Sequence, residues 1–201
     1  MVGMENPVLL LPGYTDDEDD LKTIAAYLWE AGFQVYPFSP RPSDGSVLLE
    51  DLALQLQAYI ELTFGPEQAV DLVAFSMGGL ISRWYVQKLG GDQRVQRLIT
   101  LATPHNGTLY AYMPVNSPGL HQMQPGSDFL NELNEDLSPL TRINFTSIWT
   151  PLDLTVFPAT SCLMDVGKMV RLMLPHHRAL LSYRRCFAAV VKELRAPVDR
   201  F

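Results

Sequence analysis

Short apolar runs alternate along the chain with segments in which an apolar residue recurs at every third or fourth position. A strand buried on both faces appears as a continuous apolar run, whereas an amphipathic helix repeats at about 3.6 residues. The runs predict strands at residues 8–11, 33–37, 70–75, 95–102, 143–149 and 169–174. The helical spacing predicts helices at residues 21–31, 52–63, 80–89 and 183–194, and glycines follow the first three of them closely.

The order of these elements predicts the fold class. Strands that alternate with helices form βαβ units, and such units build a mostly parallel sheet with helices on its faces. A length of 201 residues fits one domain with a sizeable core. We therefore expect a single α/β domain over residues 1–201.

Residues 106–143 depart from this alternation. They contain four prolines, three glycines and one short predicted helix at residues 128–133. A connection of this length in a compact domain is usually functional rather than a simple link. We therefore expect a cap or lid insertion over residues 106–143, within the domain.

Composition and charge exclude several classes of function. A net charge of −7 disfavours nucleic-acid binding and gives no attraction to anionic lipid, so any transient membrane or lipid-surface contact would be apolar. Cys162 and Cys186 lack the spacing of metal ligands, and we expect two free buried thiols and no metal. The first residues lack a signal-peptide pattern, and no apolar run approaches the roughly 20 residues of a membrane span. We therefore expect a cytoplasmic protein.

The acidic residues 16–20 suggest either a calcium site or the start of a helix. Carboxylates near a helix N-terminus are favoured by the helix dipole and cap its free N–H groups. We interpret these residues as a helix start.

The sequence AFSMG at residues 74–78 lies between a predicted strand and a predicted helix. It fits the nucleophile elbow G-x-S-x-G with alanine in the first place; small residues two positions from the serine allow the strained turn to pack closely. Ser76 is therefore our candidate nucleophile, although many serines in turns would match so loose a pattern. The Met77 N–H, at the helix start, is a candidate oxyanion donor. The second donor should come from the loop after the first strand, as the N–H of Tyr14 or of Thr15.

In a site of this kind, an acid and then a histidine follow the serine along the chain. Asp153 comes soon after the predicted strand at residues 143–149, at the sheet edge where sites collect in open α/β folds. His176 and His177 lie together before the last helix, and their spacing does not choose between them. One of them would act as general base towards Ser76, and Asp153 would orient it.

Six segments that span most of the chain carry a family resemblance. They are VLLLPGY, VDLVAFSMGGLISRWYVQKLGG, LITLATPHNGT, MQPGSDFLNELN, TPLDLTVFPATS and HHRALLS. In this order they resemble the oxyanion strand and loop, the elbow and its helix, the next strand, part of the cap, the acid loop and the histidine loop of the α/β-hydrolase superfamily. The resemblance is to its compact bacterial lipases and esterases, related to triacylglycerol lipases.

The resemblance also implies which histidine is the base. In the family, apolar residues stand three and four positions after the catalytic histidine, and Leu180 and Leu181 hold those places relative to His177. The chain departs from the family at Pro12-Gly13, where members often have His-Gly. This change affects the side-chain support of the loop but not its backbone donor.

Apolar residues of the predicted cap suggest a pocket for an acyl chain. The candidate pocket residues are Met113, Met123, Phe129 and Leu130. Methionine suits such a pocket because it repacks readily around flexible chains. The same side chains would also serve to pack the cap onto the core, and the two interpretations are compatible.

Together these features predict a serine carboxylic ester hydrolase, a lipase or esterase that needs no cofactor. It would act on lipid-like acyl esters through an acyl-enzyme on Ser76. An acyltransferase, a thioesterase or an amidase would use the same residues, because a fold does not determine the reaction. A non-catalytic lipid-binding protein is the alternative from another class, and the ordered set of Ser76, Asp153 and His177 argues against it. The sequence leaves the natural substrate and the oligomeric state open.

Overall fold

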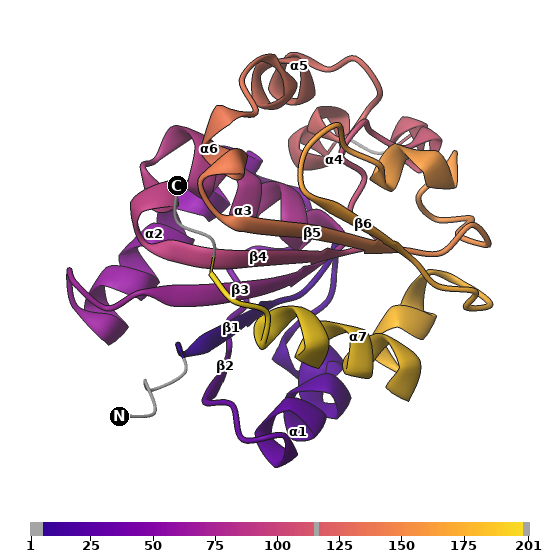
Figure 1. Cartoon of the computed structure of the whole chain (residues 1–201). Coiled ribbons are helices and arrows are strands. Elements are labelled where there is room, and N and C mark those ends of the chain that lie inside the picture. Colours follow the sequence, from indigo (N-terminus) through magenta and orange to yellow (C-terminus); the bar gives the residue numbers. More distant parts are fainter. Residues whose placement is uncertain (1–5, 115–116, 199–201) are drawn as a thin grey trace.

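The protein has a central parallel sheet with helices on both faces (Figure 1). This computed structural model describes residues 6–114 and 117–198. Within those ranges the sheet has six parallel strands in the order β2-β1-β3-β4-β5-β6. The strands are β1 (Val8–Leu11), β2 (Val35–Pro37), β3 (Val70–Phe75), β4 (Val95–Leu101), β5 (Asn144–Trp149) and β6 (Lys168–Arg171). This arrangement confirms the predicted fold class.

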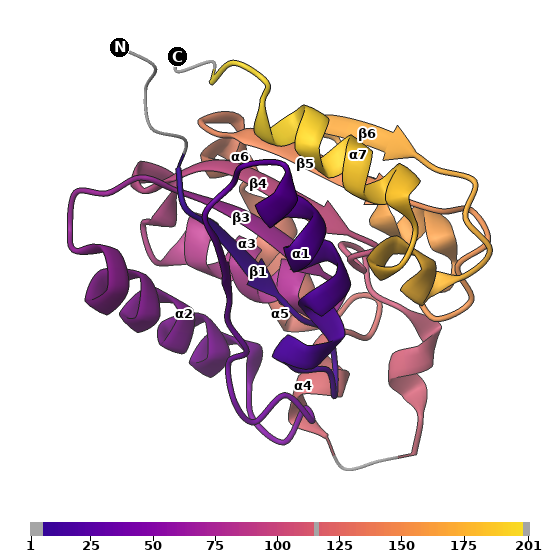
Figure 2. The same cartoon turned by 90° about the horizontal axis from the view of Figure 1, so that it is seen from below.

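Helices connect the strands and form a layer on each side of the sheet. The α-helices are α1 (Lys22–Glu30), α2 (Leu49–Phe64), α3 (Met77–Lys88), α4 (Pro118–Gln122), α5 (Asp128–Glu135), α6 (Ser138–Thr141) and α7 (Arg184–Leu194). Short 3-10 helices are η1 (Glu18–Leu21), η2 (Gly91–Gln93), η3 (Leu109–Tyr112), η4 (Ala159–Cys162) and η5 (His177–Leu181). Helices α1 and α7 lie side by side on one face, as the view from below shows (Figure 2), while α2 and α3 cover the other.

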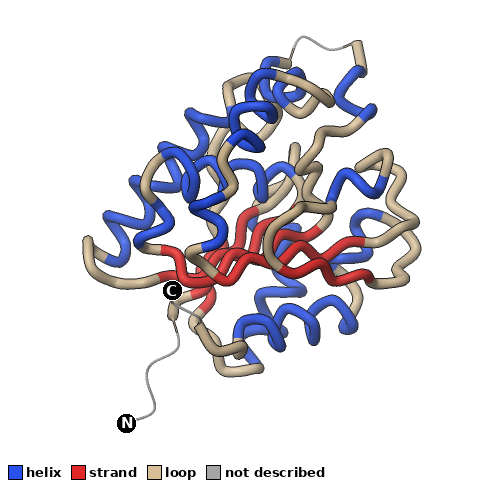
Figure 3. The backbone as a smooth tube through the Cα atoms, turned by 45° about the horizontal axis from the view of Figure 1, so that its top comes forward, coloured by secondary structure: helices blue, strands red, loops and turns tan. Residues whose placement is uncertain are grey.

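Each face of the sheet has its own hydrophobic layer, because successive side chains of a strand point to opposite faces. Leu9 and Leu11 of β1 pack with the side of α2 and α3, whereas Val8 and Leu10 pack with the side of α1 and α7. The strands therefore lie enclosed between two helical layers (Figure 3). Burial on both faces explains why the central strands appear in the sequence as continuous apolar runs.

Most predicted elements lie within three residues of the observed ones, and the shift at the start of α3 has a clear cause. The helix begins at Met77, three residues before the predicted start at residue 80. Gly78 and Gly79 occupy its first turn, and glycine is a poor helix former. The helical pattern in the sequence therefore becomes visible only after them.

Residues 106–143 connect β4 to β5, and residues 115–116 among them lie outside the described ranges. Helices α5 and α6 pack against α3 and extend the helical layer on that face (Figure 1). The other part, η3 and α4, contributes side chains to a cavity at the carboxyl ends of the strands. The described segment therefore has two parts, of which the part before α5 borders that edge of the sheet.

The buried side chain of Arg83 anchors α3 to α5. Its guanidinium donates to the Leu133 carbonyl and to Asn134 Oδ1, both at 2.9 Å, and its Nη1 lies 3.4 Å from His105 Nδ1. His105 then has its proton on Nε2, 3.0 Å from Thr100 Oγ1. Burial lowers the pKa of Arg83 to about 9. Burial and the charge of Arg83 hold the pKa of His105 well below its usual 6.5, so the imidazole is neutral.

Replacing His105 with glutamine is expected to flatten the pH dependence of stability. Unfolding frees His105 to take up a proton below about pH 6.5, whereas the folded chain keeps it neutral, so acid favours the unfolded state. Protonation of His105 in the unfolded chain should lower the free energy of unfolding by up to about 1.4 kcal/mol for each pH unit below about pH 6.5. Urea unfolding between about pH 5 and pH 7 measures the slope.

His121→Gln, which removes an exposed histidine of α4, is the matched control. The interpretation of His105 would be wrong if His105→Gln kept the slope of the wild type.

Candidate active site

Ser76 forms the turn between β3 and α3. Its backbone has φ 51° and ψ −120°, a conformation that residues with a Cβ rarely adopt. Gly78 and Gly79 permit the close packing of this turn. A Cβ at these positions would lie 2.4 Å from the Pro12 carbonyl oxygen and 2.0 Å from Thr103 Oγ1, respectively. The structure therefore has the strained strand-to-helix turn that the sequence predicts, with the N-terminus of α3 at the serine.

Asp153 and His177 form a buried pair. The distance from Asp153 Oδ2 to His177 Nδ1 is 2.7 Å, and Asp153 Oδ1 accepts hydrogen bonds from the N–H groups of Thr155 and Val156. Asp153 is 1% exposed and His177 is 8% exposed, whereas His176 is at the surface. The carboxylate places the imidazole proton on Nδ1, which leaves Nε2 as the proton acceptor. The structure thus pairs Asp153 with His177 and not with His176.

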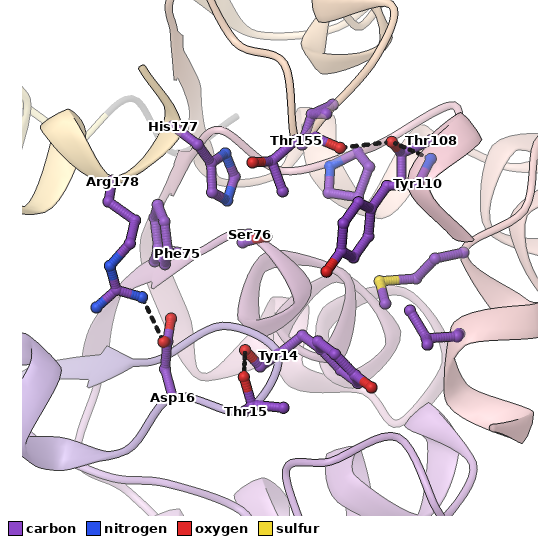
Figure 4. Close-up of a pocket in the computed structure, with 14 residues that line it drawn as sticks. Tyr14, Thr15, Asp16, Phe75, Ser76, Thr108, Tyr110, Thr155, His177 and Arg178 are labelled. Atoms are coloured by element: carbon purple, nitrogen blue, oxygen red, sulfur yellow. Dashed lines mark hydrogen bonds and ion pairs between the residues drawn. The ribbon is translucent and has the colours of Figure 1, made fainter. Parts of the chain in front are cut away.

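Ser76 and His177 line one cavity of about 210 Å³ (Figure 4). The ring of Phe75 packs against the imidazole of His177 in a tilted arrangement, with 4.6 Å between the ring centroids. The cavity lies at the carboxyl ends of the parallel strands, where open α/β sheets place their sites. Ser76 follows β3 and His177 follows β6, and both line the cavity. Asp153 follows β5 and binds the imidazole of His177.

The loop after β1, residues 12–16, forms the wall of the cavity beside the serine and is called the β1 loop below. A Cβ on Gly13 would lie 3.1 Å from Ser76 Cβ and 3.0 Å from Asp16 Oδ2, so glycine permits the close approach of this loop. Thr15 has a φ of 59°, a second strained residue next to the cavity.

The backbone N–H groups near Ser76 differ in their availability. The Thr15 N–H already donates to the Ser43 carbonyl at 2.8 Å. The Tyr14 N–H has no acceptor among the described residues. Met77 is the first residue of α3, where an N–H has no partner within the helix. This geometry favours Tyr14 over Thr15 as the second donor beside Met77.

The four residues suggested for the acyl pocket have different positions. Met123 lines the cavity, whereas Met113 is half-buried and is not among the lining residues. Phe129 and Leu130 are buried in the core on the α3 side of the sheet, and the ring of Phe129 stacks on Trp84 at 5.0 Å. The structure corrects the expectation for these two residues: the apolar face of α5 packs onto α3 and does not reach the cavity.

Several cavity residues were not predicted from the sequence. Tyr110 and Leu120 lie in the same segment as the suggested residues, and apolar character alone does not show which side of a short helix faces the site. Asp16 and Arg178 also line the cavity, with Asp16 Oδ1 2.5 Å from the Arg178 guanidinium. No local pattern links this pair, since 162 positions separate the two residues.

The acidic segment at residues 16–20 caps a helix, in agreement with its interpretation. Asp17 caps η1, and Asp20 completes the capping box by accepting from the Asp17 N–H. Within the described ranges, no group of three or more histidine, cysteine or acidic side chains is arranged to hold a metal ion.

Neither cysteine is an alternative nucleophile. Cys162 and Cys186 are both buried and unbonded. Burial raises the pKa of Cys186 to about 12, and burial together with the charge of Asp153 raises that of Cys162. A thiol reacts as the thiolate, so both are inert at neutral pH.

A family model described as the alpha/beta hydrolase fold matches residues 6–154. The chain belongs to the α/β-hydrolase family. This assignment covers β1, the Ser76 turn and Asp153, and it ends before His177.

Solved structures of lipases have the same fold. Lipase BlEst2 of Bacillus licheniformis in its mature form has a TM-score of 0.78 at 16% identity, over 96% of this chain and 93% of that one. Lipase B of Aspergillus fumigatus has a TM-score of 0.79 at 18% identity, over 97% of this chain and 54% of that one. A structure of the metagenome-derived lipolytic enzymes LipS and LipT has a TM-score of 0.72 at 14% identity, over 96% and 95%. No curated protein matches the chain. At these identities the likeness establishes the fold.

Ser76→Gly is expected to be more stable than Ser76→Ala by about 1 kcal/mol, because the strain of about 1–3 kcal/mol that glycine relieves exceeds the roughly 0.5–1 kcal/mol of extra backbone entropy that it loses on folding. Both variants lack the hydroxyl, so the difference between them reports the backbone strain that glycine relieves less the extra backbone entropy that it loses on folding. Urea unfolding of the two variants measures it. Equal stabilities would contradict this expectation and limit the strain to the entropy difference of roughly 0.5–1 kcal/mol.

Proposed function

We propose that this protein is a serine carboxylic ester hydrolase, a lipase or esterase that acts on lipid-like acyl esters. The observation that carries this proposal is the buried pair of Asp153 and His177, whose imidazole lines the same cavity as the strained Ser76. The similar structures reported above are named as lipases or lipolytic enzymes, which favours an acyl ester as the substrate.

The proposed reaction begins with attack of Ser76 Oγ on the ester carbonyl carbon, while His177 Nε2 takes the hydroxyl proton. Asp153 stabilises the imidazolium that forms. The carbonyl oxygen becomes an oxyanion, which the N–H groups of Met77 and Tyr14 stabilise. His177 then gives its proton to the leaving alkoxide, which departs as an alcohol and leaves an acyl ester on Ser76.

Water completes the proposed cycle. His177 takes a proton from water as the water oxygen attacks the acyl carbon, and a second tetrahedral intermediate forms. When this intermediate collapses, His177 returns the proton to Ser76 Oγ and the carboxylic acid is released. Every proton transfer uses side chains of this chain, which is why the proposal involves no cofactor.

The wild type is expected to hydrolyse p-nitrophenyl esters, and Ser76→Ala to lower kcat by at least roughly a thousandfold.

In a series from acetate to palmitate, short chains should react fastest, because the cavity of about 210 Å³ is smaller than the roughly 300–1,000 Å³ of most ligand pockets. Release of p-nitrophenolate measures both effects.

The adjacent histidines provide a matched control for this experiment. His177→Gln should lose activity as Ser76→Ala does, whereas His176→Gln should stay within about twofold of the wild type. Equal rates in the wild type and Ser76→Ala would refute the assignment. Transfer of the acyl group to an added alcohol in preference to water would instead make the protein an acyltransferase.

Three exposed apolar residues stand next to cavity-lining residues along the chain and are called the apolar rim below. They are Leu109, Leu154 and Phe157, which are 50%, 80% and 49% exposed. Each is a sequence neighbour of a residue that lines the cavity, and the Leu109 N–H donates to the Phe157 carbonyl at 2.9 Å. None of the helices in the described ranges has the length and apolar character of a membrane span. We propose that the rim makes a transient contact with a neutral lipid surface, since a net charge of −7 gives no attraction to anionic lipid.

Replacing Leu154 and Phe157 with serine is expected to lower hydrolysis of emulsified tributyrin by about tenfold, because apolar area is lost from the surface contact. Hydrolysis of dissolved p-nitrophenyl acetate should not change. Leu62→Ser on α2, where the leucine is 88% exposed, is the matched control. Titration of released acid measures the emulsion rate, and an unchanged rate in the double variant would remove the rim from the proposal.

A further inference from the structure

Arg178 joins two loops of the candidate site. It directly follows His177, in the loop between β6 and α7 (residues 172–183, the β6 loop). Its Nη1 lies 2.5 Å from Asp16 Oδ1, and its Nη2 contacts Asp20 Oδ1. Figure 4 shows the guanidinium reaching from the histidine side of the cavity to Asp16 beside Tyr14. The Arg178 guanidinium thus connects the loop that carries His177, the proposed base, with the loop that carries Tyr14, the proposed oxyanion donor.

The sheet does not fix these two loops directly against each other. Strands β3, β4 and β5 lie between β1 and β6. The pair of Asp153 and His177 fixes the β6 loop to the loop after β5, but not to the β1 loop. The ion pairs of Arg178 provide a direct connection between the β1 and β6 loops.

The carboxylate of Asp16 lies close to the serine. Asp16 is 6% exposed, and its Oδ2 lies 3.0 Å from the point that a Cβ on Gly13 would occupy. Ser76 Cβ lies 3.1 Å from that same point. A nearly buried negative charge here opposes the oxyanion that forms on the carbonyl attacked by Ser76, since low-dielectric surroundings strengthen such repulsion. The guanidinium of Arg178 offsets this charge.

We propose that Arg178 is a positioning residue for the reaction. By binding Asp16, Arg178 keeps the Tyr14 N–H and the His177 imidazole in their positions around Ser76. It also offsets the negative charge of Asp16 beside the oxyanion. This inference rests on the proposed function. Misplacement of a reacting group by about 1 Å costs on the order of a hundredfold in rate.

The test compares Arg178→Gln with the wild type in two assays: turnover of p-nitrophenyl butyrate, and the rate of Ser76 labelling by a fluorophosphonate. We expect Arg178→Gln to lower both kcat and the labelling rate on the order of 10- to 100-fold, with KM within about threefold. Arg178→Lys should recover part of the loss, because it restores the positive charge but not the two-armed geometry.

Arg142→Gln is the matched control. It removes the ion pair of Arg142 with Asp92, in which the two charged atoms lie 2.6 Å apart. The side chains of this pair are about as exposed as those of Arg178 and Asp16, but they do not line the cavity. Both glutamine variants should lose a similar amount of stability, because each takes a half-exposed arginine away from a nearly buried aspartate. Only the Arg178 variant should lose kcat. Equal losses in the two variants, or a loss explained by a lower melting temperature, would overturn the inference.

Asp16→Asn tests whether Arg178 acts through this carboxylate. The double variant Asp16→Asn with Arg178→Gln should be no slower than Arg178→Gln alone, because residues that act as a pair are not additive. Additive losses would overturn the inference.

The labelling assay separates failure of the inference from failure of the proposed function. A wild type that the fluorophosphonate does not label at Ser76 would refute the proposed function and this inference with it. A wild type that is labelled, with Arg178→Gln equally reactive, would refute the inference alone.

Discussion

The strained turn at Ser76 is the constraint on which the rest of the site depends. A residue with a Cβ in this conformation costs of order 1–3 kcal/mol, and it persists only where surrounding packing holds it. Strand β3 is buried along its whole length on one side of the turn. The Ser76 N–H donates to the Leu101 carbonyl of β4 at 2.8 Å, and Arg83 ties the following helix to α5. The core of the domain thus stabilises a backbone that would be unfavourable by itself.

The close approach of three backbones to that turn explains the small residues around it. Gly13 brings the β1 loop against Ser76, and Gly78 allows α3 to pass the Pro12 carbonyl. These contacts bring the backbone of the β1 loop close to the serine and to the first turn of α3. The proposed reaction uses the backbone N–H groups of these segments because fixed dipoles need no rearrangement when charge develops.

The long connection between β4 and β5 combines structural and site roles in separate parts. Phe129 and Leu130 belong to the core, and α5 receives the guanidinium of Arg83. Thr108 binds the loop after β5 by donating to the Thr155 carbonyl at 2.7 Å, and both residues line the cavity. The part of the connection that faces the cavity is therefore linked directly to the loop that carries Asp153.

The sequence by itself determined the order of strands and helices and the candidates Ser76 and Asp153. Burial on both faces produces continuous apolar runs, and the carboxyl ends of parallel strands meet at one edge, so local patterns predict both the fold and the place of the site. Spacing along the chain does not separate His176 from His177, the family resemblance implies His177, and the tertiary structure pairs His177 with Asp153. His176 and His177 differ by one position, and only the start of η5 turns His177 inward to Asp153. The tertiary structure also decided that Phe129 faces α3, and that Arg178 meets Asp16 across 162 positions, because long-range packing leaves no periodic signal in the sequence.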